Sequence, residues 1–151
     1  MRASRVKIGR RGAASVETAI VLLVILTITV GMFDLGMGVF RNNILSQAAR
    51  QGSRIVIVHG HLAPPQLSEW GPAGYTATGD SAGEIPTAIR PYLAGLDPSR
   101  VNVSVVWLDD HNELEGRVRV TVSTTYQPFL AFIFGNSTYN LAASSTQRIA
   151  H

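Results

Sequence analysis

Residues 10–34 of this chain read RRGAASVETAIVLLVILTITVGMFD, and this stretch decides how the rest of the molecule is arranged. No charged side chain lies between Thr18 and Phe33. As a helix, the segment from Ala13 to Asp34 is about 32 Å long, which matches the roughly 30 Å hydrocarbon thickness of a bilayer. A chain of 151 residues has too small a core to surround such a helix. We therefore expect a membrane span rather than a buried helix.

Positive charge is concentrated ahead of this segment. The sequence pI is near 9.8, yet five of the 13 Lys and Arg residues fall within residues 1–12, where no acid offsets them. The rest of the chain holds eight arginines against ten acids, so we expect no cationic surface for nucleic acid. The positive-inside rule places the N-terminus in the cytoplasm and everything beyond about residue 40 outside.

The helical pattern continues beyond the apolar segment, through residues 41–58. Apolar and small residues recur on one stripe, while arginine, asparagine and glutamine occupy the other faces. The stripe consists of Phe40, Ile44, Ala48, Gly52 and Ile55. Its small residues would let a second element approach closely. We predict one helix from about residue 14 to about residue 58, first in lipid and then against a folded head.

The helical pattern ends near residue 58. Residues 60–83 are rich in Gly and Pro and predict a loop without regular structure. Ser81 and Glu84 have the spacing of a capping box, so a short helix is expected over residues 84–95, bent or divided by Pro91.

From residue 101 the apolar period changes to two. Valines alternate with polar residues over 101–105 and again over 118–122, with a polar turn between them, which predicts an antiparallel hairpin with one apolar face. A third strand is expected over about 138–149. The apolar face of this sheet needs a cover, and the helical stripe described above is the candidate.

These elements predict an α+β fold shaped like a lollipop. A long N-terminal helix, transmembrane and then amphipathic, packs on a small antiparallel sheet that forms the head. The expected organisation is a basic leader over residues 1–12, a transmembrane helix over 13–40 and an extracytoplasmic head over 41–151, whose strands lie within 101–149.

The junction between the leader and the apolar helix carries the strongest functional signal. In a secretory signal peptide the apolar region precedes the cleavage point, whereas here Gly12 precedes the apolar helix. A cut after Gly12 would therefore leave the helix in place as an anchor.

Glu17 is a carboxylate about one turn into this helix. Such a group costs about 2.5–3.5 kcal/mol at the membrane centre, and less near the interface, so we expect it to have a partner. The new α-amino group of Ala13 on a neighbouring subunit would supply one and would fix the axial register between helices. Alternatively, Glu17 complements the helix N-terminus among lipid headgroups.

Gly12 and Glu17, at the start of an apolar helix, resemble the type IV prepilin cleavage motif G-x-x-x-x-E. The wider pattern over about residues 9–58 resembles the TadE-like pseudopilins of the Tad (tight adherence, Flp) pilus system. It consists of GAASVETAIVLLVIL, then FDLG, then NNILSQAARQGSR. Thr18 departs from the family, which often has Phe or Tyr at that position.

The resemblance implies a pilin-like fold, cleavage between Gly12 and Ala13 by a prepilin peptidase and a role as a minor pilin or pseudopilin in Tad pilus assembly. The implied partners are other pseudopilins, the major Flp-type pilin, a membrane assembly platform, a cytoplasmic ATPase and the lipid bilayer. The sequence leaves open whether the protein stays in the cytoplasmic (inner) membrane or joins the fibre. It also leaves open the choice among the TadE-like, TadF-like and TadG-like branches.

Two further features are candidate interfaces. Asp34 either marks the outer boundary of the membrane or pairs with a cation on an assembly partner. The apolar cluster that includes Phe129, Phe132 and Phe134 is expected to pack in the core of the head, with binding to a second pseudopilin as the alternative.

We predict no catalytic residue, no cofactor and no metal site. The chain has no cysteine, which excludes disulfides and thiolate chemistry, and no nucleophile motif frames its serines. His59 and His61 lack a third ligand, and the acidic turn at 109–115 lacks EF-hand spacing. The alternative function is that of an uncleaved single-pass membrane protein with an extracytoplasmic binding head.

Overall fold

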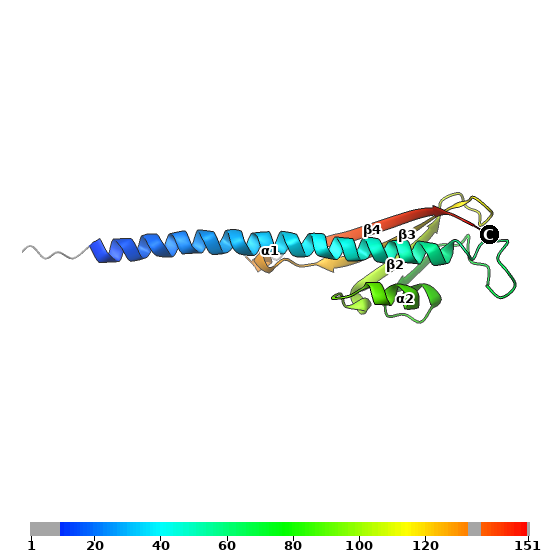
Figure 1. The fold of residues 1–151 in the computed structure, drawn as a ribbon, viewed down its shortest axis with the longest axis horizontal. Helices are drawn as coiled ribbons and strands as arrows, with labels where there is room; N and C mark the ends of the chain where they lie inside the picture. The colour runs from blue at the N-terminus through cyan, green and yellow to red at the C-terminus, as the bar shows by residue number, and fades with distance from the viewer. Residues whose placement is uncertain (1–9, 133–136, 151) are drawn as a thin grey trace, which may run out of the picture.

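In the computed structural model, which describes residues 10–132 and 137–150, a long helix carries a small sheet along its far half (Figure 1). Helix α1 spans Arg10–Val56, which corresponds to a length of about 70 Å. The strands are β1 (Tyr75–Thr78), β2 (Val101–Trp107), β3 (Arg117–Tyr126) and β4 (Tyr139–Arg148). The shorter helical segments are α2 (Glu84–Ile89), η1 (Arg90–Tyr92), η2 (Pro98–Arg100) and η3 (Phe129–Phe132). The predicted α+β, pilin-like arrangement is confirmed.

The sheet is an antiparallel meander with the strand order β1-β2-β3-β4. In the β2–β3 pair, Val103 lies opposite Val122 and Val105 lies opposite Val120, and these four side chains are at most 1% exposed. Their outward-facing neighbours along each strand are more exposed, as the period of two predicted. The hairpin and the third predicted strand are confirmed as β2, β3 and β4.

Strand β1 lies within residues 60–83, where a loop was expected, so that part of the prediction is wrong. The strand is only four residues long and pairs with β2 along its whole length. Glycine and proline flank it instead of interrupting it, and an edge strand needs partners on one side only. Tertiary pairing thus orders a segment whose own sequence signal is weak.

The C-terminal half of α1 covers the apolar face of β3 and β4, and α2 packs beside it. The helix face in contact is not quite the predicted stripe, because Phe40 is 55% exposed. Beyond Asp34, the buried positions of α1 in this half are Leu45, Ala48, Ala49, Gly52, Ser53 and Val56. Small residues decide which face meets the sheet: a Cβ on Gly52 would lie only 3.1 Å from Cγ1 of Val120.

Helix α2 begins at Glu84 without a side-chain cap, so the predicted capping box is wrong. The Ser81 hydroxyl instead accepts a hydrogen bond of 3.2 Å from the Thr78 N–H and closes the turn after β1. Pro91 divides the helical segment as predicted, because the chain continues beyond Ile89 as the 3₁₀ segment η1.

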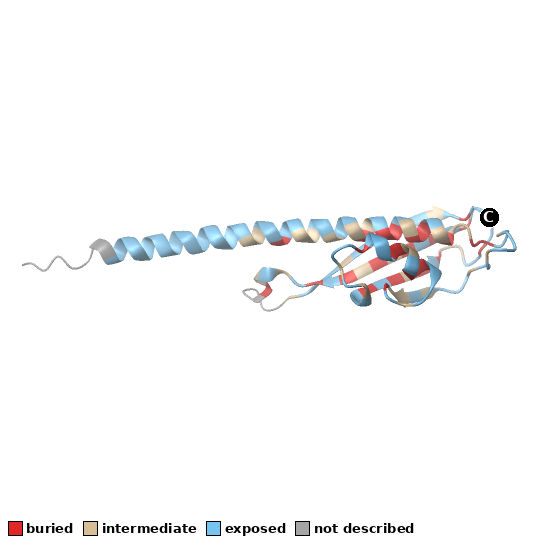
Figure 2. Ribbon diagram, turned by 60° about the horizontal axis from the view of Figure 1, so that its bottom comes forward, coloured by how far each residue is buried: buried red, intermediate tan, exposed pale blue. Residues whose placement is uncertain are grey.

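The N-terminal half of α1 extends away from the head, and its residues 12–29 are all exposed (Figure 2). It contains a window of mean hydropathy 2.3 with no part buried, and by length and composition it could cross a membrane. The hydroxyls of Thr18, Thr27 and Thr29 each donate to the carbonyl four residues earlier, at 2.8–2.9 Å. These polar side chains are therefore satisfied within the helix, as a lipid environment requires.

Candidate functional site: the anchor helix and its contact with the head

The predicted cleavage site lies in the first turn of α1. The helix begins at Arg10, about four residues before the expected start, so the bond between Gly12 and Ala13 is helical here. Gly12 is exposed, and a Cβ at this position would have no atom within 4 Å. A peptidase that binds extended backbone must first unwind this turn. Glycine favours that step, since it is about 1 kcal/mol less stable than alanine in a helix.

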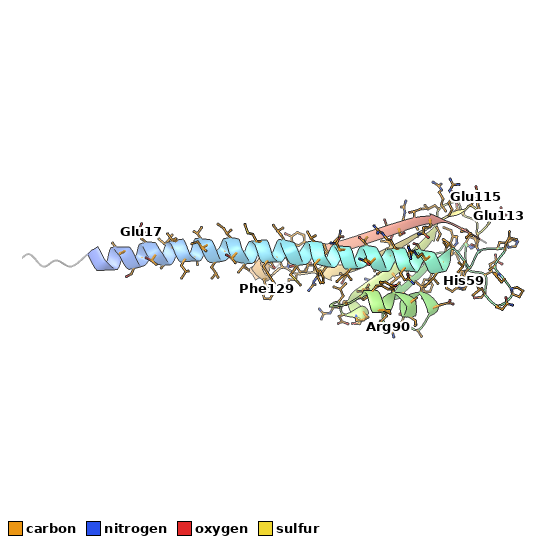
Figure 3. All side chains as sticks on the ribbon, viewed as in Figure 1. Glu17, His59, Arg90, Glu113, Glu115 and Phe129 are labelled. Carbon is orange, nitrogen blue, oxygen red and sulfur yellow. The ribbon has the colours of Figure 1, made fainter. Side chains whose placement is uncertain are left out.

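Glu17 is exposed on the next turn of α1, near the end of the molecule farthest from the head (Figure 3). Within residues 10–132 and 137–150, no group bonds to its carboxylate. The described part of the chain therefore leaves this carboxylate available to a partner from outside it. Glu17 and Asp34 are separated by about 25 Å along the helix axis.

Asp34, the second carboxylate of the apolar helix, is only 8% exposed. One carboxylate oxygen accepts a hydrogen bond of 2.8 Å from the backbone N–H of Phe129, and the other accepts one of 2.9 Å from Leu130. The Tyr126 hydroxyl lies 3.2 Å from both the carboxylate and the main-chain carbonyl of Asp34. The Asp34 carboxylate is thus occupied by its own chain.

These contacts cap the start of η3, whose first N–H groups have no partner within the segment. The carboxylate does what an N-cap residue does, but it comes from α1 instead of from the residue preceding η3. Arg41 adds a positive charge nearby, because its guanidinium carbon lies 4.7 Å from the centre of the Tyr126 ring. The arrangement ties the connection between β3 and β4 to the outer end of the apolar helix.

Phe129 is not part of the core, which corrects the expectation for this member of the apolar cluster. Its side chain is 71% exposed, and its ring contacts that of Phe33 edge-to-face with the centroids 6.3 Å apart. Ala131 is buried instead, at 4% exposure. Phe132 belongs to η3, but its side chain lies outside the described part of the structure, as does the whole of Phe134.

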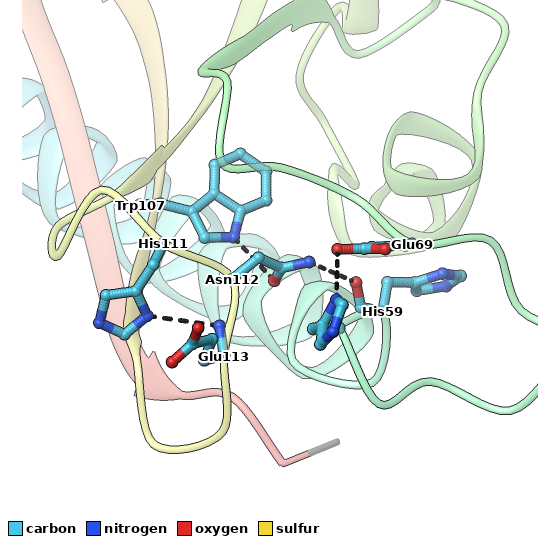
Figure 4. A network of polar contacts seen from close by, with 7 residues as sticks. His59, Glu69, Trp107, His111, Asn112 and Glu113 are labelled. Atoms are coloured by element: carbon cyan, nitrogen blue, oxygen red, sulfur yellow. Dashed lines mark hydrogen bonds and ion pairs between the residues drawn. The ribbon is translucent and has the colours of Figure 1, made fainter.

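The far end of the head is held by a buried polar network (Figure 4). The side-chain oxygen of Asn112 accepts a 3.3 Å hydrogen bond from the Trp107 indole, and its amide nitrogen donates to the His59 carbonyl at 3.3 Å. The His59 ring stacks on Trp70 at 3.7 Å and lies 3.4 Å from a Glu84 oxygen. The contacts of His59 thus hold the end of α1 to the loop and to α2. The described residues contain no group of three or more His, Cys, Asp or Glu side chains that could hold a metal.

Together these features define a class of protein: a pilin-like chain whose apolar helix is exposed in its first half and covered by a small antiparallel sheet in its second. A sequence model of the family described as TadE-like protein matches residues 12–54. The match confirms the resemblance over this segment. The segment contains Gly12, Glu17, Asp34 and Gly52. Comparisons with curated proteins and with solved structures gave no match.

Proposed function

We propose that this protein is a pseudopilin of a Tad (Flp) pilus assembly system, processed after Gly12 by a prepilin peptidase. The observation that carries the proposal is the coincidence of three features at one point. The TadE-like segment begins at Gly12, the apolar helix begins there too, and the residues around the bond are exposed. The head contributes structure and contacts rather than catalysis.

The proposed location is the cytoplasmic (inner) membrane, with the N-terminus in the cytoplasm and the head outside. The basic leader supports this orientation through the positive-inside rule. The exposed half of α1 supports the membrane location, because an apolar surface of this length has no other cover in the described chain.

After cleavage, Ala13 carries a new α-amino group about 6 Å along the helix axis from Glu17. Within one helix this amine points towards the cytoplasmic end, so the Glu17 carboxylate is better placed for the amine of a neighbouring helix. Such a pair selects processed over unprocessed subunits and sets the stagger between helices. The exposed apolar surface of α1 then packs against other pseudopilins, the Flp-type pilin or the assembly platform.

The test is the mass of the N-terminus of the membrane-extracted protein, with and without a co-expressed prepilin peptidase. We expect a chain that starts at Ala13 only when the peptidase is present. Gly12→Val should abolish this product, whereas Gly9→Val, a matched change in the same leader, should retain it. If residues 1–12 remain attached in every case, the processed pseudopilin is excluded, and an uncleaved single-pass protein with a binding head becomes the better description.

A further inference from the structure

We propose that the segment Pro128–Ala131 is a second membrane contact, which inserts Phe129 into the outer leaflet beside the anchor helix. The head then rests on the bilayer surface instead of standing clear of it on a single helix. This inference depends on the membrane anchoring included in the proposed function and adds a lipid-binding surface to it.

The depth of the segment follows from the anchor. A span of about 20 residues that starts near Ala13 ends near Phe33. Because the Phe129 ring is in contact with the Phe33 ring, the two side chains lie at the same level. Figure 3 shows Phe129 beside α1, displaced from the head towards the Glu17 end. The turn therefore lies at the outer boundary of the hydrocarbon layer.

The surface at this level is apolar and uncovered. Phe33, Leu35 and Phe129 are 57%, 74% and 71% exposed. Leu35 also lines a groove of about 470 Å³ between α1 and the connection from β3 to β4. Leu130 lines that groove from the head side and Gly31 from the helix side. These residues continue the lipid-facing surface of α1 without a break, which favours lipid over water as their surroundings.

The backbone N–H groups of the segment are paired within the protein. Pro128 has no N–H, those of Phe129 and Leu130 donate to Asp34, and that of Ala131 donates to the Pro128 carbonyl at 3.1 Å. All three N–H groups of these four residues thus have a partner within the protein. Hydrocarbon offers no water to an unpaired N–H, so these bonds remove the cost of free donors at the edge of the bilayer. Asp34 is then the group that makes insertion of the turn feasible.

Groups suited to the headgroup region lie on the head side of the turn. Tyr139 is 55% exposed, the Tyr126 hydroxyl lies 3.2 Å from Asp34, and the Arg41 guanidinium lies over the Tyr126 ring. Tyrosine and arginine are the residue types that proteins place at this depth, with apolar parts towards the lipid and polar ends towards water.

The absence of cysteine allows a direct test in the full-length protein. Single variants Phe129→Cys, Phe33→Cys and Leu114→Cys each carry one nitroxide spin label, in vesicles of phosphatidylethanolamine and phosphatidylglycerol. Leu114 is the matched water control, because it is 54% exposed in the β2–β3 turn at the opposite end of the head. The measurement is the ratio of collision rates with oxygen, which concentrates in lipid, and with a water-soluble nickel chelate.

We expect the ratio at position 129 to match that at position 33 and to exceed that at position 114 severalfold. Adding Asp34→Ala to Phe129→Cys should lower the ratio at 129, while the same addition leaves position 33 in lipid. All three labelled sites are exposed, so the substitutions should fold, which circular dichroism checks.

Two results would overturn this inference but leave the proposed function intact. In the first, the label at position 129 behaves like the label at position 114 while position 33 lies in lipid. In the second, the label at position 129 is shielded from both collision partners, which indicates a protein neighbour. If position 33 is also in water, the anchor itself fails, and the proposed function fails with it.

Discussion

The Asp34 carboxylate of helix α1 accepts a hydrogen bond of 2.8 Å from the backbone N–H of Phe129, in the connection between the third and fourth strands. Leu130 donates to the other oxygen, and the Asp34 side chain is buried beneath these contacts. The outer end of the apolar helix and the head are therefore joined at two places: here and where the sheet covers α1. This double attachment fixes how the head is oriented relative to the helix.

Replacing Asp34 with asparagine should loosen the connection between β3 and β4. Asparagine presents a donor where the carboxylate presented a second acceptor, so either the Phe129 or the Leu130 N–H loses its partner. An unsatisfied buried donor costs about 1–3 kcal/mol, which corresponds to an exchange rate raised roughly tenfold or more. Hydrogen–deuterium exchange of peptides covering 127–131 measures this. Asp110→Asn, on an exposed turn, should leave the exchange unchanged, and equal exchange in both variants would contradict the role given to Asp34.

Replacing Gly52 with leucine should destabilise the whole head. The helix backbone approaches Val120 and Ile89 so closely at Gly52 that even a Cβ would lie 3.1 Å and 3.5 Å from their side chains. Overpacking of this kind costs about 1–3 kcal/mol, and more when the backbone must shift. Thermal unfolding in detergent, followed by circular dichroism, should show a lower midpoint. Gly36→Leu is the control, since a Cβ at Gly36 meets nothing within 4 Å; similar melting of both variants would count against the close approach.

Periodicity was enough to predict the main elements of the fold. The apolar run before Asp34 and the alternating valines of β2 and β3 are signals that local sequence carries. The face that α1 turns to the sheet was harder to predict. The apolar pattern placed the large Phe40 on the stripe, but close packing selects the small residues Ala48 and Gly52, which let the backbone approach.

The contact at Asp34 was beyond sequence reasoning. A carboxylate within an apolar helix signals a partner, and that signal was present. Its partners, however, are two backbone N–H groups from a distant turn, and backbone groups leave no signature in the side-chain pattern. The exposure of Phe129 was missed for a related reason: an apolar cluster is more often core, and only the position of the turn beside the anchor reverses that preference.

Replacing Asn112 with alanine should weaken the far end of the head. Asn112 is 6% exposed, and its removal leaves the Trp107 indole N–H and the His59 carbonyl without the partners that they have now. Each buried group left unsatisfied costs about 1–3 kcal/mol. The free energy of unfolding from urea titration should fall accordingly. Asn102→Ala, on the exposed face of β2, should change it little, and a loss of the same size there would show that the buried network is not the cause.

The Asp109–Arg117 pair should make a small, pH-dependent contribution to stability. Hydrogen bonds from the Arg117 side chain, and next from its backbone N–H, lower the pKa of Asp109 from 3.8 to about 2. Because the pKa is lower in the folded chain, the charged carboxylate stabilises the fold above about pH 4, and this contribution is lost as the pH falls towards 2. The difference in unfolding midpoint between the wild type and Asp109→Asn should shrink over that interval. A difference that stays constant from pH 6 to pH 2 would exclude the ion pair as its source.

Glu17 should matter for assembly but not for processing or insertion. Glutamine at this position keeps the size of the side chain and lowers the cost of placing it in lipid, so the variant should insert and be cut after Gly12 as the wild type is. It cannot pair with the α-amino group of Ala13 on a neighbouring helix, and losing one partner of a buried pair costs about 3–5 kcal/mol. In the producing organism, with the variant as sole copy, surface pili counted by electron microscopy should fall at least about tenfold on that basis. Thr18→Val, which removes a hydroxyl bonded within its own helix, should leave the pili unchanged. Normal pilus numbers with Glu17→Gln would mean that the carboxylate serves only the helix N-terminus among the headgroups, and that register between subunits is set elsewhere along α1.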